Sequence, residues 1–228
     1  MSVAKQVTVL LAEDHAIVRQ GLSALLKADG HFKMVGEARN GREAVEMAKA
    51  LKPDVILMDI AMPILNGLEA TRQILAADAA AKIMILSAHS DDEYIERMSE
   101  AGVSGFLEKQ TSAEILTKSI QDVAMGKKVF SPSIMKRLSH DHGKSRDRDG
   151  VIKANGNRLT PRESEVLQLV AEGSANKQVA ASLGISIKTV EKHRQQLMDK
   201  LNIHDTAGLT RYAISAGVIE SSVQLTTI

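Results

Sequence analysis

Two hydrophobic patterns alternate over the first 125 residues. Short, almost continuous apolar runs rich in Val, Ile and Leu are typical of strands that are buried on both faces of a sheet. Between these runs, apolar residues recur at helical spacing, as at Val18, Leu22 and Leu25. This alternation predicts an α/β domain whose five-stranded parallel sheet is doubly wound with right-handed crossovers. Strands are expected at residues 7–12, 33–38, 54–58, 82–86 and 104–107, and helices around 18–26, 44–51, 66–76, 91–101 and 112–125.

The pattern changes from Gly126 onward. Residues 126–155 are expected to form a connector, with one short helix at 132–138. The rest of this segment is polar, contains several glycines and a mixed-charge run, and has no apolar periodicity. Those features are typical of a flexible linker. The sequence therefore predicts a first domain over residues 1–125, followed by this connector.

Only helical patterns follow, over residues 156–220. Three start signals coincide at the first helix, because Thr160 can cap it, Pro161 suits its first position and Glu163 completes a capping box. The other helices are expected at 177–183, 187–201 and 206–217. We therefore predict an all-α domain of four helices, with a tail over 221–228.

Composition excludes several classes of protein. The 228 residues include no Cys, which rules out disulfides, thiolate metal sites and cysteine catalysis. Only 2% of the residues are aromatic, so a surface that stacks single-stranded bases is not expected. No apolar run approaches the roughly 20 residues that cross a bilayer, and the first residues lack a signal-peptide cleavage pattern. We expect a cytoplasmic protein with no membrane partner.

The net charge of +1 is an average over two regions of opposite sign. Residues 1–125 hold 13 Lys and Arg against 18 Asp and Glu, whereas residues 126–228 hold 16 against 10. The first domain is therefore acidic, and the basic remainder has the charge that a DNA phosphate backbone attracts.

Polar residues stand at the carboxyl ends of the predicted strands, where doubly wound sheets bind their ligands. Glu13 and Asp14 follow the first strand, Asp59 ends the third, Ser87 ends the fourth and Lys109 follows the fifth. The strand order 2-1-3-4-5 makes the first and third strands neighbours, so the three carboxylates would share one small space. We regard this convergence as more informative than any of the five residues alone, since a single strand-terminal Asp is more often a cap.

Three neighbouring carboxylates cannot all stay ionised without a compensating cation. Oxygen ligands favour a hard divalent ion, and Mg²⁺ is typically held by one or two carboxylates with water and phosphate. Ser87 can donate to a phosphoryl oxygen and Lys109 can neutralise another. The set predicts a phosphoryl-transfer site in which an aspartyl phosphate is chemically plausible.

A family resemblance adds to this interpretation. It is carried by Glu13-Asp14, Asp59, Met62-Pro63, Asn66-Gly67, Ser87-Ala88 and Lys109. In this order the motifs resemble the receiver domain of bacterial two-component response regulators, over about residues 6–125. The resemblance implies that Asp59 accepts phosphate from a sensor histidine kinase. It further implies that Mg²⁺ is bound by Glu13, Asp14, Asp59 and the backbone carbonyl of Ala61.

The same resemblance implies that Ser87 and Phe106 form a switch pair and that Lys109 contacts the phosphoryl group. Two features depart from the family. Gln110 stands where relatives usually have Pro after the lysine, often with a cis bond; a cis bond before a non-proline residue costs about 3–4 kcal/mol, so a trans bond is expected. Phe106 replaces the common Tyr, and a plain core role for Phe106 remains an alternative.

The predicted third helix of the second domain, Ile187 to Leu201, follows a tight turn at Gly184. This spacing fits a helix-turn-helix, whose second helix lies in the major groove of DNA. The string that carries a second resemblance is Leu159–Glu163, Val166-Leu167, Gly173, Asn176-Lys177, Val179-Ala180, Leu183–Ser186, Lys188–Val190, His193 and Lys200-Leu201. It resembles a LuxR-type DNA-binding domain over about residues 156–220. With the receiver, the whole chain resembles the NarL/FixJ class of response regulators.

This second resemblance implies contacts to bases or phosphates of double-stranded promoter DNA. The residues that would make them are Lys188, Thr189, Lys192, His193, Arg194 and Gln195. A packed structural role for His193 remains open. The family also implies dimerisation through the last helix, around Leu209, Tyr212 and Ala213, which are equally consistent with ordinary core.

We therefore expect a transcription regulator that is not an enzyme beyond its own phosphoryl transfer and slow dephosphorylation. Phosphorylation of Asp59 would control formation of a homodimer and DNA binding, with RNA polymerase as a further candidate partner. Two alternatives stay open: a regulator of the same architecture that works without phosphorylation, and a phosphatase that uses Asp59 as nucleophile. Haloacid-dehalogenase-type phosphatases usually have a second Asp two positions on, where this chain has Ala61.

Overall fold

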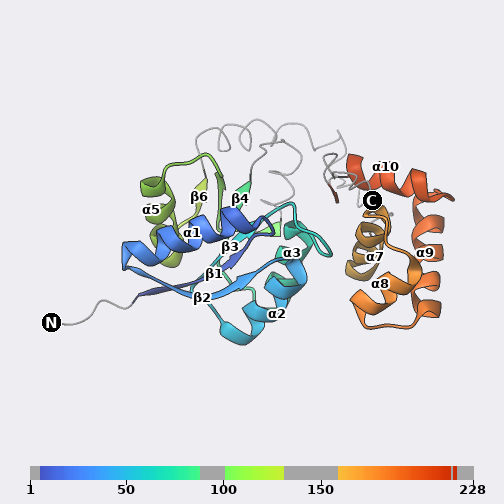
Figure 1. Ribbon diagram of the computed structural model, residues 1–228, viewed down its shortest axis with the longest axis horizontal. Coiled ribbons are helices and arrows are strands. Elements are labelled where there is room, and N and C mark those ends of the chain that lie inside the picture. Colours follow the sequence, from blue (N-terminus) through green and yellow to red (C-terminus); the bar gives the residue numbers. More distant parts are fainter. Residues whose placement is uncertain (1–5, 88–100, 131–158, 217, 220–228) are drawn as a thin grey trace, which may run out of the picture. The chain divides into compact units, whose positions relative to one another are not determined.

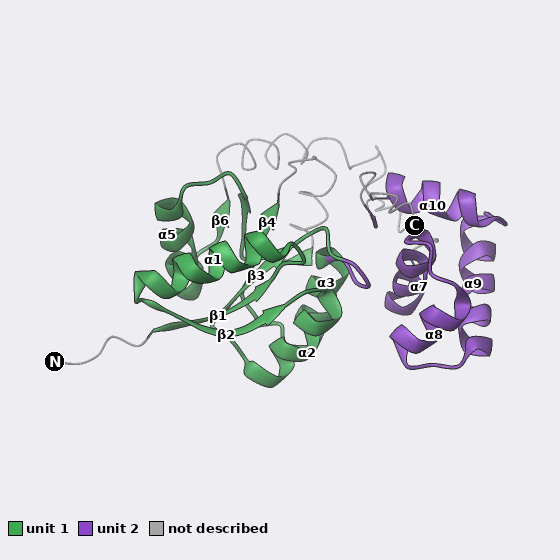
Figure 2. Ribbon diagram, in the orientation of Figure 1, with its two compact units in different colours: residues 1–62, 67–152 green, residues 63–66, 153–228 purple. Residues whose placement is uncertain are grey.

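The computed structural model describes residues 6–87, 101–130, 159–216 and 218–219. The chain divides into two compact units, which Figure 2 colours separately. The first comprises residues 1–62 and 67–152, and the second comprises residues 63–66 and 153–228. The predicted helices at 91–101 and 132–138, most of the connector and the tail at 221–228 lie outside the described residues, apart from the end of the first of these helices.

The first unit contains a parallel sheet in the strand order β2-β1-β3-β4-β5-β6 (Figure 1). The strands are β1 (Val7–Ala12), β2 (Phe32–Ala38), β3 (Val55–Asp59), β4 (Ile83–Ser87), β5 (Gly105–Glu108) and β6 (Val129–Phe130). The first five follow the predicted order 2-1-3-4-5, and their bounds differ from the predicted ones by at most one residue at either end. The fold class is therefore confirmed.

A sixth strand was not predicted. Val129–Phe130 pairs in parallel with β5, so that Gly105 lies opposite Val129 and Phe106 opposite Phe130. From the sequence pattern, these two residues were expected at the start of the connector. A pair of residues is too short to show the period of two by which a strand is recognised. The strand is identified only by its backbone pairing with β5.

Helices cover both faces of the sheet. They are α1 (Ala16–Asp29), α2 (Gly41–Leu51), α3 (Gly67–Ala77) and α5 (Ala113–Ala124). On one face, α1 and α5 contribute Leu26, Leu116 and Ile120 to an apolar core with alternate residues of the strands. On the other face, α2 lies against Gly36 of β2, whose Cα hydrogens leave room for Met47. Strand residues therefore meet apolar side chains on both faces, which explains their uninterrupted apolar runs.

The amino ends of β1 and β3 are fixed by a polar pair that is unusual in this apolar sheet. Asp54 Oδ2 accepts hydrogen bonds from the backbone N–H of Thr8 at 2.8 Å and from its hydroxyl at 2.7 Å. The Thr8 hydroxyl oxygen in turn accepts from the backbone N–H of Asp54 at 2.8 Å. These bonds set the register of the two strands whose opposite ends carry the acidic residues.

The described part of the second unit is a cluster of four helices around its own apolar core. They are α7 (Pro161–Ala171), α8 (Asn176–Leu183), α9 (Ile187–Leu201) and α10 (Thr206–Ser215). The predicted capping box is present, since the Thr160 hydroxyl and the Glu163 carboxylate each accept a backbone N–H of the other residue. Ser186 caps α9 and Asp205 caps α10, as predicted. Among the described residues, none of the helices is long and apolar enough to cross a membrane.

Candidate functional site

The carboxyl ends of β1 and β3 bring the predicted acidic residues together. Ala12, the last residue of β1, pairs with Met58, directly before Asp59 at the end of β3. One side-chain ligand atom from each of Glu13, Asp14, His15 and Asp59 lies within 4.8 Å of the others. Glu13 and Asp59 are buried, whereas Asp14 is half-buried. Strand pairing thus concentrates negative charge where water is largely excluded.

Lys109, which follows β5, supplies the opposing charge. Its Nζ lies 2.8 Å from Glu13 Oε2 and 3.0 Å from Asp59 Oδ2. Burial, followed by repulsion from Glu13, raises the pKa of Asp59 from 3.8 to about 7, against the lowering effect of Lys109. Desolvation acts to lower the pKa of Lys109, but its two carboxylate partners raise it overall, so the ammonium stays charged. With a pKa of about 7, Asp59 exists as a mixture of carboxylic acid and carboxylate near neutral pH.

The donor set fits a hard divalent cation. Glu13, Asp14 and Asp59 offer carboxylate oxygens, which are the ligands that Mg²⁺ prefers. Asp14 Oδ1 is buried and accepts no hydrogen bond from the described residues, and His15 Nδ1 lies 2.9 Å from it. A buried carboxylate oxygen without a donor is costly, and a bound cation would satisfy it. Ala61 lies two residues beyond Asp59 and is half-buried.

The backbone after Asp59 is held against the first turn of α3. The N–H of Gly67 donates to the carbonyl of Ile60 at 2.8 Å. A Cβ atom on Gly67 would lie 1.9 Å from the carbonyl oxygen of Asp59, closer than real Cβ contacts come. Only glycine permits this approach. The glycine of the Asn66-Gly67 motif is therefore required sterically for the backbone position of Asp59.

Ser87 and Phe106 occupy the two strands beyond Asp59. Asp59 pairs with Leu86, so Ser87 follows one position later at the end of β4. Ser87 is 4% exposed and Phe106 is 1% exposed. The Phe106 ring is thus buried in the core of this structure, and its role in a switch pair stays a prediction. The Lys109–Gln110 bond is trans, because the described residues contain no cis peptide bond.

Two residues near the pocket were not predicted from the sequence. His15 is exposed, and its Nδ1 lies 3.2 Å from Glu13 Oε1. Arg19, in the first turns of α1, donates to the backbone carbonyls of Glu13 and Asp14. The signal for Arg19 was available, since a cation occurs among the apolar residues Val18 and Leu22 that face the sheet.

The predicted DNA-contacting residues all lie on α9, and the structure divides them into two groups. Lys188, Lys192 and Gln195 are exposed, whereas Thr189, His193 and Arg194 are half-buried. Val190 and Leu197 are fully buried in the core of the unit. The helix therefore presents a polar face with two exposed lysines.

Three of the predicted contacts have partners within the second unit. Arg194 donates to Asn176 Oδ1 at 2.7 Å and to the Thr206 hydroxyl at 3.1 Å, which links α9 to the first residues of α8 and α10. Gln195 donates to Asp199, and the Thr189 hydroxyl shares a hydrogen bond with Ser186. The Arg194 guanidinium thus braces the domain, a role that residue type and spacing do not reveal.

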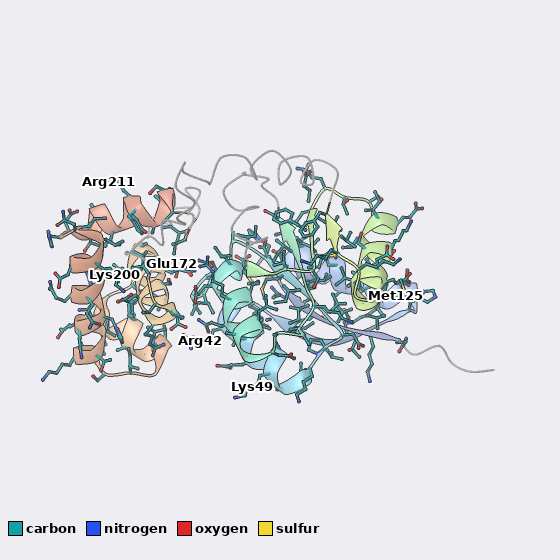
Figure 3. The ribbon with its side chains drawn as sticks, turned by 180° about the vertical axis from the view of Figure 1, so that it is seen from behind. Arg42, Lys49, Met125, Glu172, Lys200 and Arg211 are labelled. Atoms are coloured by element: carbon teal, nitrogen blue, oxygen red, sulfur yellow. The ribbon has the colours of Figure 1, made fainter. Side chains whose placement is uncertain are left out.

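A partly buried ion pair fixes the other end of α9. Lys200, labelled in Figure 3, lies on α9, and its Nζ is 2.6 Å from Glu163 Oε2 of α7. Burial acts to raise the pKa of Glu163, but the hydrogen bonds from Lys200 and Thr160 outweigh it and lower the pKa overall. In α10, Leu209 and Ala213 are fully buried within the unit's core, and Tyr212 packs against it. The core alternative therefore holds for Leu209 and Ala213, which leaves them unavailable for a dimer contact.

Family models match both units. Residues 9–121 match the response regulator receiver domain, and residues 157–213 match the bacterial regulatory proteins of the luxR family. The two matches fall on the sheet with its acidic pocket and on the helical unit, respectively.

Among curated relatives, the chain is 31% identical over 226 residues to the transcriptional regulatory protein DegU of Brevibacillus brevis, covering 94% of this chain and 96% of DegU. It is 33% identical over 214 residues to the response regulator protein VraR of Staphylococcus aureus, covering 94% and 99%. A solved complex of the two-component response regulator RcsB with DNA is 25% identical, with a TM-score of 0.56 and coverage of 92% and 99%. The chain belongs to the NarL/FixJ class of two-component response regulators, which join a receiver domain to a LuxR-type DNA-binding domain.

Proposed function

We propose that this chain regulates transcription in the cytoplasm through reversible phosphorylation of Asp59 by a sensor histidine kinase. The observation that carries the proposal is the convergence of Asp59, Glu13 and Lys109 at the carboxyl ends of three strands. A buried carboxylate whose pKa is about 7 is ionised to a useful extent near neutral pH. Asp59 can therefore act as the nucleophile without a separate base.

The chain's own residues account for the transfer step. An Asp59 carboxylate oxygen attacks the phosphorus of the kinase's phosphohistidine, so that an O–P bond forms while the N–P bond breaks and the leaving imidazole takes a proton from water. Lys109 turns from Asp59 toward the phosphoryl oxygens and keeps its contact with Glu13. The Ser87 hydroxyl donates to another phosphoryl oxygen. Glu13 thereby keeps the ammonium in place while Asp59 changes its charge.

Glu13, Asp14, Asp59 and the carbonyl of Ala61 are the groups that would hold Mg²⁺. When bound, the ion neutralises the charge that develops on the phosphoryl oxygens. His15 is exposed and Asp14 is half-buried at the rim of the pocket, whereas Glu13 and Asp59 are buried. Slow hydrolysis of the aspartyl phosphate would be the only other chemistry of the chain.

The output is proposed to pass from the phosphoryl group to the second unit. A phosphoryl group adds charge and acceptor oxygens next to Ser87, which biases the ends of β4 and β5 and with them Phe106. The phosphorylated chain would form a homodimer, which places two copies of α9 on paired half-sites. Lys188 and Lys192 would contact phosphates or bases, with Thr189, His193, Arg194 and Gln195 as further candidates and RNA polymerase as a possible downstream partner. Support for DNA as the partner comes from the RcsB complex named above.

A labelling experiment tests the phosphoacceptor. The full chain is incubated with acetyl phosphate and Mg²⁺, and the phosphorylated fraction is measured by intact-protein mass spectrometry. Asp59→Asn should abolish labelling, while Asp78→Asn, which changes an exposed carboxyl outside the pocket, should leave it at the parent level. Equal labelling of the parent and Asp59→Asn would show that Asp59 is not the acceptor.

A binding experiment tests the regulation. Affinity for promoter DNA is measured against salt concentration, with and without phosphorylation, because phosphate contacts give log affinity a linear dependence on log salt. Phosphorylation should raise the affinity at every salt concentration. Unchanged affinity would favour a regulator that works without phosphorylation, and steady turnover of a phosphate ester would favour a phosphatase.

A further inference from the structure

Arg19 is a cation that points away from solvent in the first unit. It lies on α1, five residues after Asp14, and its side chain is 11% exposed. A guanidinium is always charged at physiological pH, so burying it is costly unless its donors find partners. The partners that Arg19 has are therefore informative about why it is there.

Those partners are the backbone carbonyls of the two acidic residues after β1. One guanidinium nitrogen, Nη1, donates to the carbonyl of Glu13 at 2.7 Å and to that of Asp14 at 3.0 Å. The side chain of Glu13 meanwhile reaches Lys109 in the pocket. One residue thus has its backbone tied to α1 and its carboxylate tied to the end of β5.

Glu37 of β2 lies next to the guanidinium on a further side. Its Oε2 is 4.0 Å from Arg19 Nε, while its Oε1 accepts from the Ser23 hydroxyl at 2.7 Å and lies 3.5 Å from Lys27 Nζ. Glu37 also pairs in register with Leu11, two residues before Glu13. The guanidinium is therefore confined between β2, α1 and the loop that carries Glu13 and Asp14.

This arrangement differs from a general packing contact. The loop of Glu13 and Asp14 carries two of the three carboxylates of the pocket, and residues that fix the groups around metal ligands commonly govern the affinity of the site. The positive charge of Arg19 also lies behind a pocket whose carboxylates repel one another. Both effects act on the loop, and neither requires Arg19 to touch a ligand.

We propose that Arg19 is a positioning residue for the phosphorylation site, which holds the backbone of Glu13 and Asp14 so that their carboxylates are ready for a divalent cation. The proposal rests on the proposed function, because it concerns the same pocket. Arg19 acts through the carbonyls and makes no contact with the cation or the phosphoryl group. Glu37 supports it by confining the guanidinium.

The test compares Arg19→Met with Lys27→Met in the full chain. Both changes remove one cation beside Glu37 and keep an apolar stem, but the described contacts of Lys27 do not include the acidic loop. Affinity for Mn²⁺ is measured from the loss of the free-ion electron paramagnetic resonance signal. In parallel, labelling by acetyl phosphate is followed over a range of Mg²⁺ concentrations.

Arg19→Met should weaken Mn²⁺ binding about 10-fold or more, the usual effect of losing a supporting residue around a metal site. The Mg²⁺ concentration for half-maximal labelling should rise by a similar factor, whereas the rate at saturating Mg²⁺ falls much less. Lys27→Met should stay within about twofold of the parent, because Lys27 is itself exposed. Arg19→Lys, which keeps the charge but offers a single ammonium, should lie between the parent and Arg19→Met.

A purely structural role predicts another result. Arg19→Met would then lower the unfolding temperature while Mn²⁺ affinity and the Mg²⁺ requirement stay at the parent level, and that outcome overturns the proposal. If Arg19→Met does not fold, Glu37→Gln replaces it, with a smaller loss of Mn²⁺ affinity and faster amide hydrogen exchange at residues 13–15 expected. Parent-like affinity and exchange in Glu37→Gln would count against the arrangement. A parent chain that neither binds Mn²⁺ nor is labelled would instead overturn the proposed function and this inference with it.

Discussion

Gly67→Ala offers a sharp test of the steric argument for the backbone around Asp59. The new Cβ would stand 1.9 Å from the carbonyl oxygen of Asp59, 2.9 Å from its carbonyl carbon and 3.1 Å from the Cα of Ile60. All three atoms are backbone, so no side-chain rotation can relieve the contact. A carbon normally lies about 3.3 Å or more from a carbonyl oxygen, so the start of α3 and the end of β3 must move apart by about 1.4 Å.

The expected cost follows from this displacement. Overpacking a well-packed region typically costs about 1–3 kcal/mol. The movement also strains the hydrogen bond from Gly67 to Ile60, whose net worth is about 1 kcal/mol. We therefore expect the first unit to lose about 3 kcal/mol, which for a domain of its size lowers the unfolding temperature by roughly 12 °C.

The same substitution at Gly21 is the control. Gly21 lies in the interior of α1, is exposed, and has no atom within 4 Å of a built Cβ. Alanine is preferred over glycine in a helix by about 1 kcal/mol, so Gly21→Ala should raise the unfolding temperature by roughly 4 °C. Calorimetry of the full chain measures the unfolding temperature of both variants. The transition of the first unit is the one that both substitutions shift.

Labelling by acetyl phosphate completes the test. Because Asp59 is displaced by about 1 Å, Gly67→Ala should be labelled at least about tenfold more slowly, whereas Gly21→Ala should match the parent. An unfolding temperature of Gly67→Ala within about 2 °C of the parent would refute the steric argument. A loss of stability in Gly21→Ala would show that contacts around residue 21, rather than the helix preference for alanine, decide whether the substitution stabilises the domain.

Three further predictions concern charge and hydrogen bonding. Since burial and Glu13 raise the pKa of Asp59 to about 7, its ionisation costs folding free energy that grows from about pH 4 to about pH 7. Asp59→Asn should therefore stabilise the first unit by about 3 kcal/mol more at pH 8 than at pH 5 in thermal unfolding, and an equal gain at both would contradict the raised pKa. Arg194→Met should lower the stability of the second unit by about 1–3 kcal/mol in calorimetry, because Asn176 and Thr206 lose their donor. Lys192→Met should leave stability within about 0.5 kcal/mol but lower the slope of log DNA affinity against log salt by about one, and an unchanged slope would remove Lys192 from the interface.

The strands were predictable because this sheet is buried on both faces. Leu57 and Met58 are both fully buried on opposite faces of β3, so the run of apolar residues marks the strand directly. The caps were predictable for a local reason, since Thr160 and Glu163 satisfy each other within three positions. The convergence of Asp59 with Glu13 followed from strand order, which topology rules restrict strongly.

Other features depend on partners that are distant in sequence. Helical spacing placed Arg194 on the exposed part of α9, but only the packing of α8 and α10 shows that its guanidinium lies between Asn176 and Thr206. The part that Arg19 plays likewise depends on the bend of the loop after β1, which no periodicity encodes. Sequence patterns report which face a side chain takes, whereas hydrogen-bond partners are set by the tertiary fold.

The parallel pairing of β1 with β3 also decides when the acidic pocket arises as the chain folds. Thr8 and Asp54, which join the amino ends of the two strands, are 46 positions apart. Pairing of this kind is slow, because a long loop must close before its contacts repay the entropy. Glu13 and Asp59 become neighbours only after that closure. Their repulsion therefore destabilises the folded domain far more than it destabilises the early stages of folding. A cation that neutralises the pocket should accordingly lengthen the lifetime of the folded domain and leave its folding rate almost unchanged.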